Sequence, residues 1–176
     1  MELKEVKQQF FALRNGLLAD SLRKQASLPH KLIFGLNIIQ LRALAAQIGL
    51  DSNLAATLWA DSDCRESRLL APMIQPEPQP QWLSKVRTPE EADILCHASL
   101  RHHPRALELV RETALSPEPL LQYSALRLLL NILTSNPDAP RTARQLLRTL
   151  SPHPLTRPIF TQLTQELDYL ESENNA

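Results

Sequence analysis

Prolines stand at the start of one helix-like segment after another in the second half of the chain. Four segments show this arrangement: "HPRALELVRETAL", "SPEPLLQYSALRLLLNIL", "DAPRTARQLLRTL" and "HPLTRPIFTQLTQELDYL". Proline is tolerated in the first turn of a helix because the N–H that it lacks has no partner there. The chain has only 3 glycines but many leucines, a composition with few hairpin turns and few β-branched runs. The sequence therefore predicts an all-α protein.

The first half shows helical periodicity. An apolar stripe near the 3.6-residue period predicts a first helix over residues 3–26. Asn37 is placed to cap a second helix over residues 38–48, and Gly49 supplies the left-handed residue that ends it.

Two shorter helices are predicted before the proline-rich segment. Ser52 is placed to cap the first of them. Asp63 and Glu66 have the spacing of a capping box, which opens a helix that runs to Ile74.

The proline-rich segment "QPEPQPQ" separates two helical groups. Helices joined by tight turns match an α-α superhelix or an irregular helical stack. We predict one domain over residues 1–176 with about eight helices. It comprises an N-terminal group (1–75), a connector (76–81), a C-terminal group (82–172) and a frayed tail (173–176).

The charges balance, with 19 basic and 19 acidic residues, and this argues against strong non-specific binding to nucleic acid. Residues 113–157 nevertheless hold five arginines against two acids, a local surplus of 5 − 2 = +3. Such a surplus fits either a basic binding face or a solvated helix surface. No apolar run approaches the roughly 20 residues that cross a bilayer, so we expect a cytoplasmic protein with no membrane partner.

Three carboxylates lie close together in "WLSKVRTPEEADILCH", residues 82–97. Thr88 is placed as a helix cap, Pro89 occupies the first helical position, and Glu90 and Glu91 complement the helix dipole. These roles leave Asp93 as the acid that the start of the helix does not explain. It is either a working acid or a surface residue paired with His97 one turn later.

Cysteine and histidine cluster nearby, at Cys96, His97, His102 and His103. Adjacent residues on one helix point about 100° apart, so Cys96 and His97 do not face one ion easily. We predict neither a metal nor a cofactor.

Residues 33–74, "IFGLNIIQLRALAAQIGLDSNLAATLWADSDCRESRLLAPMI", resemble the DNA alkylation repair proteins of AlkD type. The matching features are the Phe-Gly lead-in, "LR" in the following helix, Leu-Trp, and then Glu, Arg and "LLA". The resemblance covers roughly the first two thirds of the chain. It implies a HEAT-like repeat stack, and active members of that family excise positively charged alkylated purines from DNA.

The resemblance also implies a site made of a tryptophan, an aspartate four residues later and an arginine in the next repeat. Asp93 matches the aspartate, whereas Pro89 and Tyr123 stand at the tryptophan and arginine positions. A proline offers no π face to a cationic base, and a neutral tyrosine does not replace a guanidinium that clamps a phosphate.

The leading hypothesis is therefore a degenerate relative that binds nucleic acid or a protein without full glycosylase activity. The alternatives are an active alkylpurine DNA glycosylase that uses Asp93 as its catalytic acid, and a helical protein-interaction module with no nucleic-acid role. The oligomeric state and the enzymatic status stay open at this stage. The residues predicted to contact DNA are Trp82, Tyr123, Arg127, Arg141, Arg144 and Arg148.

Overall fold

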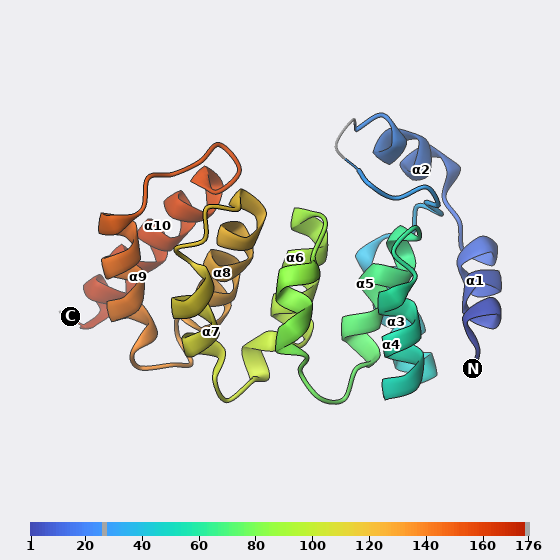
Figure 1. Cartoon of the computed structure of the whole chain (residues 1–176), viewed down its shortest axis with the longest axis horizontal. Coiled ribbons are helices and arrows are strands. Elements are labelled where there is room, and N and C mark those ends of the chain that lie inside the picture. Colours follow the sequence, from blue (N-terminus) through green and yellow to red (C-terminus); the bar gives the residue numbers. More distant parts are fainter. Residues whose placement is uncertain (26–27, 175–176) are drawn as a thin grey trace. The chain divides into compact units, whose positions relative to one another are not determined.

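A computed structural model describes residues 1–25 and 28–174. Helices follow one another along the whole of this part of the chain, and no β-strand occurs within it (Figure 1). The structure falls into two compact units, Met1–Pro78 and Gln79–Ala176. Their boundary lies inside the predicted connector 76–81, and whether the chain acts as one domain stays a prediction.

The N-terminal unit contains five α-helices among its described residues. α4 and α3 both pack against α5. Their apolar residues meet in a core that includes Phe10, Leu58 and Leu70, each fully buried. The helices are α1 (Leu3–Ala12), α2 (Gly16–Arg23), α3 (Ile38–Ile48), α4 (Ser52–Ala60) and α5 (Arg65–Ile74).

The C-terminal unit is built around α8 (Pro119–Ile132), which packs against α6, α7 and α10. Leu126 and Leu128 of α8 are fully buried at the centre of this core. The surrounding elements are the 3-10 helix η1 (Pro80–Lys85), α6 (Pro89–Ala98), the 3-10 helix η2 (Leu100–His102), α7 (Ala106–Thr113), α9 (Ala139–Thr149) and α10 (Arg157–Asn174).

The predicted starts of α3 and α6 are correct, and so is the predicted end of α3. Asn37 caps α3 by accepting the amide of Gln40 at 2.9 Å, and Gly49 follows the helix at φ +79°. Thr88 caps α6 by accepting the amide of Glu91 at 3.1 Å, with Pro89 at the first helical position.

The single helix predicted over residues 3–26 is wrong. The first helix ends with α1, and the side chain of Asn15 caps the separate helix α2 by accepting a hydrogen bond from the amide of Leu18 at 3.1 Å. Leu17, an apolar residue within the predicted helix, is 87% exposed. Residue 26 lies outside the described residues.

Two smaller predictions also need correction. α4 is capped by Asp51 rather than by Ser52, because the Asp51 carboxylate accepts the amide of Leu54 at 2.9 Å. Residues 173 and 174, which were predicted to belong to a frayed tail, are part of α10, which continues to Asn174. Residues 175–176 lie outside the described part.

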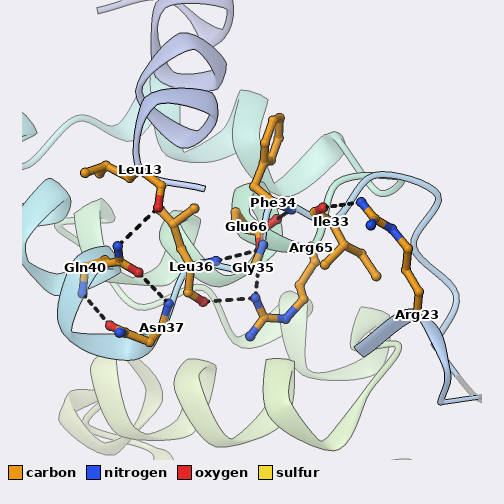
Figure 2. Close-up of polar contacts among 10 residues, drawn as sticks. All are labelled: Leu13, Arg23, Ile33, Phe34, Gly35, Leu36, Asn37, Gln40, Arg65 and Glu66. Carbon is orange, nitrogen blue, oxygen red and sulfur yellow. Dashed lines mark hydrogen bonds and ion pairs between the residues drawn. The ribbon is translucent and has the colours of Figure 1, made fainter. Parts of the chain in front are cut away.

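Glu66 does not complete a capping box with Asp63. It is fully buried, and its carboxylate accepts the amides of the loop residues Phe34, Gly35 and Leu36 at 3.0, 2.9 and 3.3 Å (Figure 2). The guanidinium of Arg65 donates both to Glu66 at 2.8 Å and to the carbonyl of Leu36 at 3.2 Å. This buried ion pair joins α5 to a loop that lies about thirty residues earlier in the sequence.

The same loop holds α2 and the end of α1 in place. The amide of Asn15 donates to the carbonyl of Phe34 at 3.0 Å, and Arg23 donates to the carbonyl of Ile33 at 2.8 Å. Gln40 of α3 donates to the carbonyl of Leu13 at 3.2 Å (Figure 2). The loop therefore connects α5 to α2 and to the segment that follows α1.

Candidate nucleic-acid interface

Asp93 of α6 faces Tyr123 and Arg127 of α8. The hydroxyl of Tyr123 donates to Asp93 Oδ1 at 2.8 Å, and Arg127 Nε lies 2.7 Å from the same oxygen. Arg127 Nη2 also donates to the Tyr123 hydroxyl at 3.3 Å. Tyr123 and Arg127 are four residues apart on one helix, so both side chains reach Asp93 from the same face of α8.

This Asp93 cluster (Asp93, Tyr123 and Arg127) lies at the protein surface. The side chains of Asp93 and Arg127 are 41% and 23% exposed, whereas Tyr123 is buried. Burial raises the pKa of Tyr123, and its hydrogen bond to Asp93 raises that pKa further. Burial lowers the pKa of Arg127, but the Tyr123 hydroxyl and the Asp93 charge outweigh this effect, and the net pKa is raised. The guanidinium therefore stays charged, and the tyrosine stays protonated at neutral pH.

A second group of charged residues lies along α9. Arg141, Arg144 and Arg148 share one helix face with Gln145 and Thr149, and these five side chains line a cavity of about 370 Å³. Arg144 contacts Glu171 of α10 through Nε at 2.8 Å and Nη2 at 2.5 Å. We call this surface the α9 arginine face. It presents guanidinium groups at the helical spacings i, i+3 and i+7.

Trp82, one of the residues predicted to contact DNA, is buried. It belongs to η1, and its side chain is only 6% exposed. Apolar burial therefore accounts for this indole better than contact with a base does. Trp59 is likewise buried, and the guanidinium of Arg68 lies over its ring at 3.4 Å from the centroid.

The cysteine and histidine cluster does not converge. Among residues 1–25 and 28–174, no three His, Cys, Asp or Glu side chains gather in a way that could hold a metal ion. Cys96 is fully buried and donates to the carbonyl of Ser124 at 3.4 Å, and burial raises the pKa of its thiol well above the ordinary range. No helix in the described part of the chain is long and apolar enough to cross a membrane.

The pairing within the Asp93 cluster is the feature that the sequence did not predict. Residue-by-residue alignment with the family pattern placed Tyr123 at the arginine position, and Arg127 was expected only as a DNA contact. The available signal was the four-residue spacing between Tyr123 and Arg127, which puts a guanidinium one helical turn beyond the aligned position.

Comparison with known proteins supports the fold. A solved structure described as "a new family of proteins related to the HEAT-like repeat DNA glycosylases with affinity for branched DNA structures" is similar to this chain with a TM-score of 0.76. The match covers 93% of this chain and 74% of that one at 16% sequence identity. No family model and no curated protein sequence matches the chain. The α-helices of this protein are thus arranged in a HEAT-like repeat fold, as predicted.

Proposed function

We propose that the protein is a DNA-binding module with a HEAT-like repeat fold that does not excise bases. The observation that carries the proposal is the set of contacts that the carboxylate of Asp93 makes. Its Oδ1 is engaged by the Arg127 guanidinium and by the Tyr123 hydroxyl at the same time. The description of the similar structure, with its affinity for branched DNA, supports the choice of DNA as the partner.

Electrostatics argues against excision at this site. Release of a cationic base passes through a sugar with oxocarbenium character, so the site must offset positive charge with a free carboxylate. The interaction energy between two opposite unit charges about 4 Å apart is about 4 kcal/mol at an effective dielectric constant of about 20, and it is smaller where solvent screens the charges. One preorganised group contributes about 3–4 kcal/mol to catalysis, so Arg127 offsets much of what Asp93 would supply.

The same geometry suits a phosphate. The side chain of Arg127 is partly exposed, and Tyr123 and Asp93 hold its charged guanidinium in position. A guanidinium can donate two parallel hydrogen bonds to two oxygens of a phosphate. On approach of DNA, a backbone phosphate competes with Asp93 for the guanidinium. Asp93 therefore has two effects. It holds the side chain of Arg127 in position, and it weakens the binding of DNA because it competes with the phosphate for the guanidinium.

We expect Arg127→Ala to weaken binding to a labelled duplex, measured by fluorescence anisotropy across a series of salt concentrations. Loss of one phosphate contact should make the negative slope of log K against log salt less steep by about 0.9. Asp93→Asn should have the opposite effect and tighten binding, since it frees the guanidinium from its carboxylate. Tyr123→Phe removes a hydroxyl without changing a charge and serves as the matched control, with an unchanged slope.

Base release provides the independent test. Wild-type protein incubated with methylated DNA should liberate no 3-methyladenine or 7-methylguanine above the spontaneous rate. Release by the wild type that disappears in Asp93→Asn would establish the glycosylase instead. Absence of DNA retention even at low salt would leave a protein-interaction role and refute the proposal.

A further inference from the structure

The α9 arginine face has the composition of an anion-binding surface. α9 turns Ala139, Thr142, Ala143 and Leu146 toward the core, and this leaves Arg141, Gln145 and Arg148 exposed on the other side. Seven residues separate Arg141 from Arg148, which is about 10.5 Å along a helix axis. The phosphates of one strand follow one another every 3.4 Å or so along the axis of a duplex, so a helix lying parallel to that axis spans about three of them over this length.

The cavity on this face is lined by three arginines, one glutamine and one threonine, without a carboxylate. All five side chains donate hydrogen bonds, and the guanidinium groups accept none. The carboxylate of Glu171 is bound to Arg144 beside this cavity. The carboxylate of Glu171 is thus an anion of the protein itself that already binds to this face. Arg141 and Arg148 project from the exposed side of the helix.

The α9 arginine face is separate from the Asp93 cluster. No residue of α6 or α8 lines its cavity. α8 packs against both α6 and α9, and Figure 1 shows α6 and α9 on opposite sides of α8. The C-terminal unit therefore presents guanidinium groups at two positions, one between α6 and α8 and one beyond α8.

We infer that the α9 arginine face is a second phosphate-binding surface, which engages a second duplex arm when the protein binds branched DNA. The inference rests on the proposed function and assigns a partner geometry to it. A linear duplex presents one backbone path to the Asp93 cluster. A four-way junction brings a second arm within reach of a surface on another side of the same unit, so only branched DNA uses both positions.

The test compares a labelled four-way junction with a linear duplex of the same total length. The double variant Arg141→Ala with Arg148→Ala should lose on the order of tenfold in affinity for the junction, and the negative slope of log K against log salt should become less steep by about 1.8. Its affinity for the linear duplex should stay at the wild-type value. Both side chains are exposed, so the circular dichroism spectrum and thermal midpoint should hardly change.

Two control variants distinguish a phosphate contact from a change in net charge. Arg105→Ala with Glu108→Gln removes an exposed ion pair outside the α9 arginine face without changing net charge, and it should leave junction binding close to wild type. Arg141→Lys with Arg148→Lys keeps both charges and should retain most of the salt slope.

Equal losses on junction and duplex would overturn the inference, because the α9 arginines would then hold the same arm as the Asp93 cluster. Unchanged junction binding in the double alanine variant would overturn it as well. Both results leave the proposed function intact. A wild-type protein that binds neither DNA would refute the proposed function, and this inference with it.

Discussion

Glu66→Ala is expected to destabilise the N-terminal unit by about 3–5 kcal/mol, the cost of breaking a buried ion pair by removing one partner. The substitution removes the carboxylate that the guanidinium of Arg65, a residue only 4% exposed, binds at 2.8 Å. It also removes the acceptor of three consecutive backbone amides in the loop 34–36. A unit of this size has a total stability of roughly 4–12 kcal/mol, so the loss is a large part of the whole.

Urea unfolding followed by the fluorescence of Trp59 measures this loss, because Trp59 is buried in the N-terminal unit. The measurement uses a Trp82→Phe background, which removes the other indole of the chain. Asp63→Ala changes an exposed carboxylate in the same unit, which forms a surface ion pair with Lys31, and it should alter the free energy of unfolding by no more than about 1 kcal/mol. A similar small effect for Glu66→Ala would show that the loop is held by other contacts.

Gly35→Ala should cost about 3 kcal/mol or more, for two separate reasons. Gly35 has φ +80°, a conformation that costs a residue with a Cβ about 1–2 kcal/mol. A Cβ at this position would also lie 2.3 Å from the carbonyl oxygen of Asn15 and 2.7 Å from the amide nitrogen of Ala19. Both are backbone atoms, so relief requires a shift of α2 itself, and overpacking of this kind costs about 1–3 kcal/mol.

The other two glycines provide a graded control for this prediction. Gly49 has φ +79°, but no neighbouring atom lies within 4 Å of the point that a Cβ would occupy. Gly49→Ala should therefore carry only the conformational cost of about 1–2 kcal/mol. Gly16 has neither feature, and Gly16→Ala should be neutral or slightly stabilising. Equal effects of Gly35→Ala and Gly49→Ala in the same urea assay would rule out the steric contribution.

The sequence predicted those parts of the fold that depend on neighbouring residues. Thr88 with Pro89, and Asn37 with Gly49, define helix ends through contacts within a few residues, and the structure confirms them. The break after α1 was missed because apolar residues continue at helical spacing across it. Helical periodicity in the sequence does not show that the Asn15 side chain caps a new helix there.

Contacts between distant residues could not be predicted in this way. The spacing of Asp63 and Glu66 fits a capping box, yet Glu66 binds amides thirty or more residues away. Asp93 likewise meets Tyr123 across thirty residues. The packing of α6 against α8 brings these two groups together, and no local pattern encodes it. The acid was identified from sequence, whereas its partners became visible only in the structure.

The position of Glu66 has a consequence for the order of folding during synthesis. The loop 34–36 leaves the ribosome well before Glu66 does, and until then its three amides lack their acceptor. All of these groups precede the boundary at residue 78, so the N-terminal unit can complete its buried ion pair while the C-terminal unit is still being translated. We expect the nascent chain to become resistant to protease once residue 78 has cleared the exit tunnel, and to stay sensitive while Glu66 is still inside it.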